Sequence, residues 1–213
     1  VKRITKAKFI FDFRGLWVDE RVDKGGWDLN RLFDRLQYKY YKRVERTLLI
    51  QSDHVVVLTN KVVDEVMKLG AIEKSRITVI PCCADYNHFP LSTDAHKIDA
   101  RISLGIPTDA FVLGYLGSIG RMYLLDRFLH LFKLAVNARK NCHAMLITRD
   151  TSAFKQLMKA HLTPELSSRV HVKSASRDEV PVFLPAIDVM VSFILSTYAR
   201  TGASPTKMAE CFA

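Results

Sequence analysis

The sequence predicts an α/β protein built from parallel sheets, and two observations lead to this prediction. Short apolar runs of strand length alternate with longer segments of helical periodicity along the 213 residues. Ten to sixteen helical residues separate successive strands, roughly the length that a right-handed crossover between parallel neighbours needs. The composition, 48% hydrophobic and 25% charged, is that of a globular chain. We therefore expect two tandem Rossmann-like units.

The first unit is predicted to begin with a strand at residues 8–13, a short apolar run. Residues 14–27 contain three glycines and predict a loop. Residues 28–50 predict a long helix with Asp28 as its N-cap.

The next elements complete a β-α-β-α-β order. The uninterrupted apolar run 54–58 predicts a buried strand. Thr59 or Asn60 is expected to cap the following helix, and Gly70 is expected to close it. A third strand is predicted at 77–80.

A polar connection divides the chain. Between Pro81 and Pro107 the periodicity weakens, and only a short helix near 97–104 is predicted. We assign residues 1–90 to the first domain, 91–107 to a linker and 108–213 to the second domain.

The second unit repeats the alternation. Its strands are predicted at 111–116, 143–148, 170–174 and 189–194, and its helices at 124–139, 152–161, 178–186 and from Pro205 onward. The chain starts at Val1 and stops inside this last helix, with no glycine or asparagine to end it. We expect the first unit to lack its beginning and the second its end.

Charge and composition restrict the functional classes. Of the net charge of +10, +6 lies in residues 1–50, which indicates an anionic partner. No apolar run reaches the length of a membrane span, and the basic start lacks the apolar core of a secretory signal, so a cytoplasmic location is expected. The four cysteines and seven histidines show no metal-ligand spacing, so neither metal nor cofactor is expected. Hydrolase elbow and Walker motifs are also missing from the sequence.

A glycine-containing turn after the predicted strand 111–116 is the first candidate site. Gly117, Ser118, Gly120 and Arg121 follow that strand. Glycines let a backbone approach a phosphate, and amides there can bind it. The spacing also fits a plain tight turn.

The start of the last predicted helix is the second candidate. Ser204 suits an N-cap and Pro205 the first helical position, which places Thr206 and Lys207 in the first turn. Lys207 and Glu210 share a helix face. A cation for phosphates beside a carboxylate for two hydroxyl groups is what a nucleotide-sugar needs. A capped surface helix with an ion pair is the alternative.

The segment that leaves the first strand is the third candidate, because ligands bind at the carboxyl edge of open α/β sheets. Charged and aromatic residues crowd there: Asp12, Arg14, Trp17, Asp19 and Glu20. A solvated loop with Trp17 packed beneath it is the alternative.

Two stripes on the predicted helix 28–50 are the fourth candidate. The apolar stripe, expected to face the core, is Leu29, Phe33, Leu36, Tyr40 and Val44. The basic stripe is Arg31, Arg35, Lys39, Lys42 and Arg46. The basic stripe fits anionic lipid headgroups, nucleic acid or an ordinary solvated face.

Five segments in this order resemble a family 4 glycosyltransferase of the GT-B fold. They are FDFRGLWVDE (11–20), HVVVLT (54–59), ITVIP (77–81), LGYLGS (113–118) and SPTKMAE (204–210). The resemblance covers almost the whole chain, as part of a longer enzyme. Each segment is short, and their common order and spacing are more specific than any one of them.

The resemblance implies retaining transfer of a sugar from a nucleotide-diphosphate donor, without a metal, between two Rossmann-like domains. It implies that Glu210 holds the ribose and that Lys207, with the backbone near Gly117 and Ser118, holds the diphosphate. Gly120, Arg121, Ser204 and Thr206 belong to the same donor side. The loop with Arg14 faces the acceptor.

Two departures from the family pattern are visible. Gly202 stands where the family often has a glutamate, and Ser118 and Tyr123 stand where it often has an arginine and a lysine. Arg121 is a candidate replacement for the cation. The residue that contacts the reacting sugar is not assigned.

We therefore expect a glycosyltransferase that acts on a glycan or glycolipid in surface polysaccharide assembly, inactive as this piece alone. Residues 28–50 are expected to dock it peripherally on an anionic membrane, and no nucleic-acid partner is expected. The alternatives are a nucleotide-sugar epimerase of the same fold and a non-catalytic basic module that binds lipid or nucleic acid.

Overall fold

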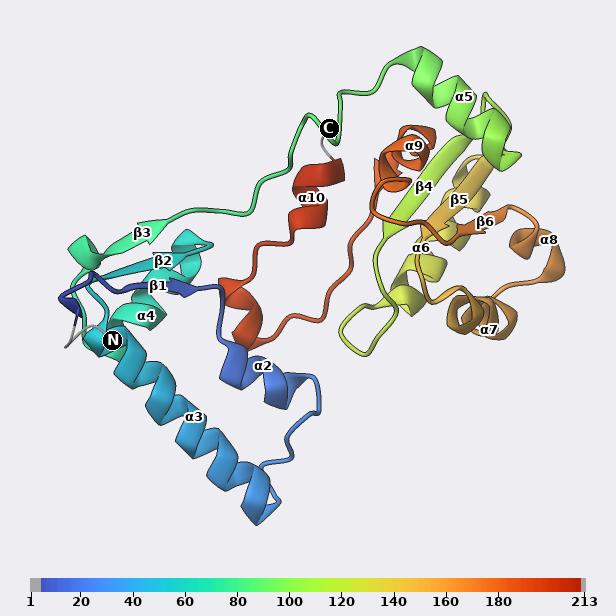
Figure 1. Ribbon diagram of the computed structural model, residues 1–213. Coiled ribbons are helices and arrows are strands. Elements are labelled where there is room, and N and C mark those ends of the chain that lie inside the picture. The colour runs from blue at the N-terminus through green and yellow to red at the C-terminus, as the bar shows by residue number, and fades with distance from the viewer. Residues whose placement is uncertain (1–4, 212–213) are drawn as a thin grey trace. The chain divides into compact units, whose positions relative to one another are not determined.

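The computed structural model describes residues 5–211, which divide into two compact units (Figure 1). Unit 1 contains residues up to 82 together with 196–205, and unit 2 contains 83–195 together with the residues from 206 onward. The chain thus leaves unit 2 after residue 195, contributes ten residues to unit 1 and returns. The assignment of acceptor and donor roles to the two domains stays a prediction.

Unit 1 holds a three-stranded parallel sheet in the order β1-β2-β3. Its strands are β1 (Ile10–Phe13), β2 (His54–Val57) and β3 (Ile77–Val79), and its helices are α2 (Trp17–Asp23), α3 (Leu32–Gln51) and α4 (Val63–Gly70). The core forms where Phe13, Val55 and Val57 pack against Leu49 of α3 and Val66 of α4. The parallel pairing predicted from the crossover lengths is confirmed.

Unit 2 holds a four-stranded parallel sheet in the order β6-β5-β4-β7. Its strands are β4 (Phe111–Leu116), β5 (Cys142–Ile147), β6 (Val170–Lys173) and β7 (Val189–Met190). Its helices are α5 (Asp94–Leu104), α6 (Leu125–Ala138), α7 (Thr151–His161), α8 (Pro164–Ser167), α9 (Val180–Phe183) and α10 (Thr206–Cys211).

Both faces of the unit 2 sheet are buried along most of β5, which explains why residues 144–147 form a continuous apolar run. Ala144 and Leu146 of β5 pack with α6 and α7, whereas the alternate residues Met145 and Ile147 pack on the other side. The side chains of all four are at most 2% exposed. The pleat therefore sends successive residues into two separate cores.

Two predicted element starts are corrected. Residues 14–27 are not all loop, because the stretch between Gly15 and Gly25 contains no glycine and forms α2. Leu16 and Val18 are buried there, and this packing stabilises the helix. Asp28 does not cap α3: its Oδ1 accepts a hydrogen bond from the Asn30 amide at 3.0 Å in a turn that precedes the helix. The long helix therefore begins at Leu32.

Gly70 does not close α4 as a left-handed residue. It is the last residue of the helix, and Ala71 adopts the left-handed conformation with φ of 48°. A Cβ at residue 70 would lie 2.9 Å from the Cβ of Leu49. Glycine is needed here because α3 and α4 approach closely.

Two predicted elements near the end of unit 2 are shorter than expected. Prolines 181 and 185 divide the predicted helix 178–186 into α9 and a single 3-10 turn. The strand predicted at 189–194 pairs with β4 only through Val189 and Met190. The last helix begins at Thr206, one residue later than the sequence predicts.

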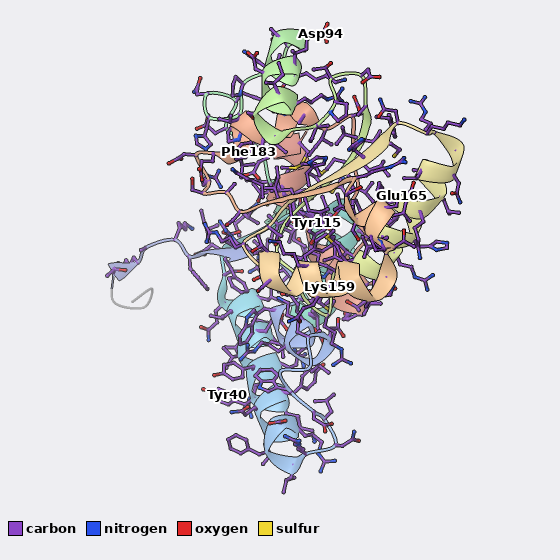
Figure 2. All side chains as sticks on the ribbon, turned by 90° about the vertical axis from the view of Figure 1, so that its right-hand side faces the viewer. Tyr40, Asp94, Tyr115, Lys159, Glu165 and Phe183 are labelled. Carbon is purple, nitrogen blue, oxygen red and sulfur yellow. The ribbon has the colours of Figure 1, made fainter. Side chains whose placement is uncertain are left out.

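The apolar stripe predicted as the core face of α3 is wrong. Phe33 is 70% exposed and Tyr40 63%, and Leu36 is also exposed, whereas the buried face carries Glu45 and Leu49. Figure 2 shows Tyr40 on this helix. Tertiary packing thus overrides the helical period read from the sequence. Within residues 5–211, no helix is long and apolar enough to cross a bilayer.

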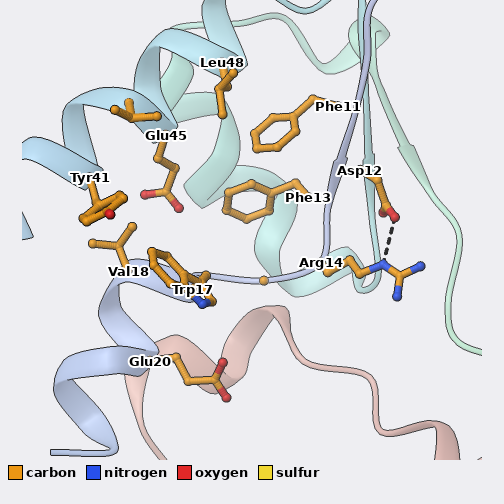
Figure 3. Close-up of a pocket in the computed structure, with 12 residues that line it drawn as sticks. Phe11, Asp12, Phe13, Arg14, Trp17, Val18, Glu20, Tyr41, Glu45 and Leu48 are labelled. Carbon is orange, nitrogen blue, oxygen red and sulfur yellow. Dashed lines mark hydrogen bonds and ion pairs between the residues drawn. The ribbon is translucent and has the colours of Figure 1, made fainter. Parts of the chain in front are cut away.

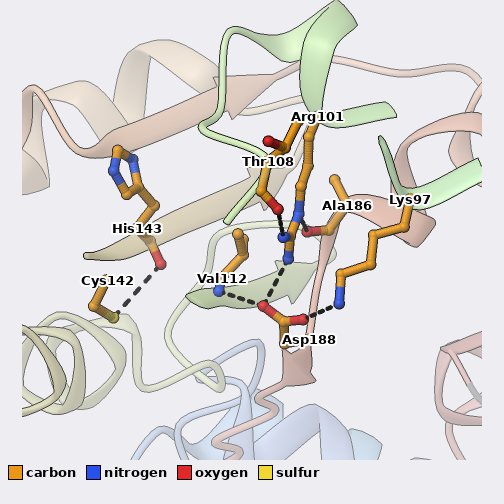
Figure 4. A network of polar contacts seen from close by, with 8 residues as sticks. All are labelled: Lys97, Arg101, Thr108, Val112, Cys142, His143, Ala186 and Asp188. Atoms are coloured by element: carbon orange, nitrogen blue, oxygen red, sulfur yellow. Dashed lines mark hydrogen bonds and ion pairs between the residues drawn. The ribbon is translucent and has the colours of Figure 1, made fainter. Parts of the chain in front are cut away.

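An ion-pair network at Asp188 joins α5 to the sheet of unit 2 (Figure 4). One carboxylate oxygen accepts hydrogen bonds from Arg101 Nη2 and the Val112 amide, each at 2.7 Å, and the other pairs with Lys97 Nζ at 2.5 Å. Burial alone would raise the pKa of Asp188, but these hydrogen bonds and charges outweigh it and lower the pKa. The Arg101 side chain is only 3% exposed, so it depends on this carboxylate for its charge balance.

We expect Asp188→Asn to lower the free energy of unfolding of unit 2 by about 3 kcal/mol, because a buried arginine loses its counter-charge. The lowered pKa also predicts acid sensitivity. The stabilisation is complete above the unfolded aspartate pKa of about 3.9 and is lost as pH falls through the lower folded value. Urea titrations followed by far-UV circular dichroism measure both effects.

Tryptophan fluorescence provides the internal control. Both tryptophans, Trp17 and Trp27, lie in unit 1, so their transition reports unit 1 alone. It should not move in the variant. An unchanged unit 2 transition would contradict the proposed role of Asp188.

Candidate functional site

A pocket of about 270 Å³ lies at the carboxyl edge of the unit 2 sheet. The ends of three neighbouring strands and the residues that follow them line it: 116–118 at the end of β4, 147–149 at the end of β5, and Ala175 and Arg177 after β6. Phe89, Val180, Lys207 and Glu210 complete the lining. Parallel strands end at the same edge, so their register alone brings these distant segments together.

Three hydrogen bonds fix the backbone conformation of the turn after β4. Gly117 has φ of 144°, a conformation that favours glycine, and its amide donates to the Ile147 carbonyl at 3.0 Å. The Tyr115 hydroxyl donates to the Ser118 carbonyl at 2.7 Å, and the Ile119 amide donates to Asp150 at 2.8 Å. Because the Gly117 amide is already used, a ligand at this turn would meet the glycine Cα and the Ser118 backbone.

Lys207 lies directly against this turn. Its Nζ lies 4.4 Å from the ring centroid of Tyr123 and 5.4 Å from that of Tyr115, which are cation–π distances. A Cβ at residue 117 would come within 2.8 Å of Nζ. The missing side chain of Gly117 therefore makes room for the ammonium group.

Glu210 lies on the same pocket wall and is 8% exposed. Its Oε1 pairs with Nη1 of Arg177 at 3.4 Å, and the Arg177 guanidinium lies 5.6 Å from the ring centroid of Phe89. The carboxylate predicted to hold a ribose is thus occupied by an arginine from the loop after β6.

Sequence reasoning missed Phe89, Thr148, Arg149 and Arg177, all of which line this pocket. For Thr148, Arg149 and Arg177 the available signal is position, because they follow the carboxyl ends of β5 and β6. Phe89 carries no such signal. With Lys207 they give three cations against the single carboxylate of Glu210, which leaves the lining with a net charge of +2. The pocket is therefore suited to a polyanion.

Four residues predicted for the donor side do not line this pocket. Gly120, Arg121 and Thr206 are exposed, and Ser204 lies in the segment that belongs to unit 1. Arg121 thus lies outside this pocket lining, whereas Arg149 and Arg177 are part of it. Its role as the replacement cation stays a prediction.

Residues predicted for the acceptor side surround a separate pocket of about 430 Å³ in unit 1 (Figure 3). Asp12, Arg14, Trp17 and Glu20 line it. Its other walls are mainly apolar and come from β1, α2 and α3. Arg14 is largely exposed and pairs with Asp12 at 2.8 Å.

Asp19 does not line the pocket in unit 1. It accepts hydrogen bonds from Tyr38 at 2.8 Å and from Lys42 at 3.0 Å. Lys42 also bonds Glu45 at 2.6 Å, so it belongs to a partly buried network and not to an exposed basic stripe. Burial outweighs the Lys42 charge and raises the pKa of Glu45.

Gly202, where the family pattern often has a glutamate, is tightly enclosed in unit 1. A Cβ there would lie 3.0 Å from the Gly15 Cα and 3.2 Å from a methyl group of Val62. The packing leaves no room for a longer side chain at this place. Across residues 5–211, no three histidine, cysteine, aspartate or glutamate side chains gather closely enough to hold a metal ion.

A parallel sheet with a pocket at the carboxyl ends of its strands is the arrangement of open α/β folds, which bind their ligands at this edge. No family model matches the chain, and no curated protein matches it either. Solved structures do match.

The HepE protein of Anabaena, solved with UDP and glucose, is 15% identical with a TM-score of 0.60, over 89% of this chain and 47% of that one. WaaG, a glycosyltransferase involved in lipopolysaccharide biosynthesis, is 21% identical with a TM-score of 0.66, and the match covers 90% of this chain and 52% of WaaG. A glycosyltransferase of Rickettsia africae is 15% identical with a TM-score of 0.58, and the match covers 90% of this chain and 46% of that protein. This chain spans about half the length of these structures. At such identities the likeness shows the fold, that of GT-B glycosyltransferases.

We expect Gly117→Ala to weaken binding of inorganic pyrophosphate by about ten-fold, because the new methyl group strains the backbone and displaces a charge-assisted contact of Lys207. Calorimetric titration measures the affinity. Gly120→Ala is the matched control, since nothing lies within 4 Å of a Cβ there. Equal affinities of the two variants would show that the turn is not an anion site.

Proposed function

We propose that unit 2 is the donor-binding part of a glycosyltransferase and that its pocket holds a nucleotide-diphosphate sugar. One observation carries the proposal: Lys207, Gly117 and Glu210 line the same pocket at the carboxyl edge of the sheet. The fold shared with HepE and WaaG supports it, and HepE was solved with UDP and with UDP-glucose.

The diphosphate is proposed to lie against the Gly117–Ser118 turn, with Lys207 Nζ as its first cation. The ribose hydroxyl groups would donate to Glu210, which requires the Arg177 contact to open. Arg177 lies 64% exposed, so its guanidinium can turn towards the phosphates without crossing a packed core. The net positive lining then matches the donor's negative charge.

The reaction breaks the bond between the sugar C1 and the diphosphate oxygen. An acceptor hydroxyl oxygen forms the new bond to C1 and gives its proton to an oxygen of the departing diphosphate, which also keeps the electron pair of the broken bond. Lys207 stabilises the charge that grows on the leaving group, so the proposed transfer uses this fixed cation in place of a metal. We propose retention of configuration at C1.

The acceptor is proposed to be a glycan or glycolipid of surface polysaccharide assembly, met by unit 1 through Arg14 and Trp17. Turnover by the complete enzyme is expected to need parts that this chain does not contain, since it spans about half of the structures that it matches. Binding of the donor by unit 2 is therefore the activity to measure on this chain.

Two variants separate the phosphate and ribose contacts. We expect Lys207→Ala to weaken the binding of both UDP and pyrophosphate by roughly ten-fold or more, because each ligand loses a charge-assisted contact. Glu210→Gln should weaken the binding of UDP but not that of pyrophosphate, because pyrophosphate has no ribose. Calorimetry with UDP, UDP-glucose and pyrophosphate measures the affinities of both variants and of the unchanged chain.

Lys155→Ala is the control, because Lys155 is exposed on α7 and outside the pocket lining. UDP should bind this variant as tightly as it binds the unchanged chain. Unaltered UDP affinity in Lys207→Ala, or binding of UDP without UDP-glucose, would count against the proposed donor site.

We also propose that α3 docks the protein on an anionic membrane, as a peripheral protein of the cytoplasmic face. Leu32, Phe33, Leu36 and Tyr40 expose between 56% and 70% of their surface. Arg31, Arg35, Lys39 and Arg46 are exposed on the same segment. Apolar side chains that enter the lipid boundary, flanked by cations for headgroups, are typical of interfacial helices.

Sedimentation with vesicles tests this surface. Phe33→Ser with Tyr40→Ser should reduce binding to phosphatidylglycerol vesicles by about ten-fold or more, because two large apolar groups leave the lipid boundary. Leu134→Ser removes an exposed apolar residue of α6 as the control. Equal binding of both variants, or equal binding to neutral vesicles, would contradict the proposal.

A further inference from the structure

Two histidines meet at the edge of the unit 2 sheet opposite the pocket. His143 is the second residue of β5 and His171 the second residue of β6, so both lie at the amino ends of their strands. His171 is paired in register with Met145, two residues along β5 from His143. The two side chains therefore project from the same face of the sheet.

The two rings are close and fixed in orientation. Nδ1 of His143 lies 3.1 Å from Nε2 of His171, and the rings are 5.4 Å apart between centroids at an interplanar angle of 26°. Both side chains are half-buried. Figure 4 shows the His143 ring turned away from the Asp188 network.

We propose that His143 Nδ1 and His171 Nε2 form a binding site for a divalent transition metal that prefers imidazole, such as Zn²⁺ or Ni²⁺. Two imidazole nitrogens at about 2.0–2.1 Å from one metal in near-tetrahedral geometry lie about 3.3 Å apart, close to the separation found here. Only a small shift is needed to admit the ion.

A metal binds the lone pair of a neutral imidazole nitrogen, while the other ring nitrogen keeps the proton. In the metal-bound form the proton of His143 is therefore on Nε2 and that of His171 on Nδ1, so that His143 Nδ1 and His171 Nε2 both present a lone pair to the ion. No proton is lost, and water completes the coordination.

Charged side chains near the histidine pair have opposite effects on a positive charge at His143. Asp109 favours positive charge at His143, and Arg169 opposes it. A bound metal would join β5 to β6 and stabilise unit 2 by mass action, since the unfolded chain does not hold the two rings together. The site is separate from the proposed donor pocket, so its outcome is independent of that proposal.

Calorimetric titration of the full chain with ZnCl₂ and with NiCl₂ tests the site. Cys82→Ser with Cys83→Ser is the background, because these neighbouring thiols are free and partly or fully exposed and would bind the same metals. We expect one ion per chain, and His143→Gln or His171→Gln should weaken its binding by at least about ten-fold.

His130→Gln and His161→Gln are the controls, since both histidines are exposed on α6 and α7. Nitrogen NMR of the imidazole rings gives a second readout, in which Zn²⁺ should shift the signals of His143 and His171 together. Mg²⁺, which prefers oxygen ligands, should shift neither. Equal Zn²⁺ affinity in all four variants, no measurable binding, or a shift of one ring alone would overturn the proposal.

Discussion

The parallel register of β4, β5 and β6 is the constraint on which the candidate site depends. It places the chain segments after three strands at one edge, although they come from parts of the sequence about thirty residues apart. The register is itself fixed by burial, because Met145 and Ile147 enter one core while Ala144 and Leu146 enter the other. A slip of one residue would exchange these faces and move the loops that line the pocket.

The charge distribution of the pocket follows from that geometry. Lys207 lies over two tyrosine rings instead of facing bulk solvent, and Glu210 is held by Arg177. Both charged groups line the same pocket as the glycine turn. The ion pair between Arg177 and Glu210 is the contact that a ribose would have to replace, so nucleotide binding and rearrangement of the loop after β6 are expected to be linked.

The sequence predicts the alternation of strands and helices well because continuous apolar runs and their spacing encode parallel sheets directly. It also identifies the two chain segments that meet at the pocket, through Gly117 and Lys207. It fails at α3, where an apolar stripe at helical spacing lies exposed and Glu45 is buried instead. It also misses Arg177, because an arginine in a polar loop looks ordinary until the strand register shows which edge it reaches. Periodicity also does not reveal that Asp19, predicted for the acceptor side, belongs to a partly buried network with Tyr38 and Lys42.

A crystal structure of this chain with UDP would test the central claim most directly. The account predicts the diphosphate against the Gly117–Ser118 turn within hydrogen-bonding distance of Lys207 Nζ, with the ribose on Glu210 and the Arg177 contact broken. UDP bound at another surface, or in this pocket with the Arg177–Glu210 pair intact and Lys207 unused, would contradict it.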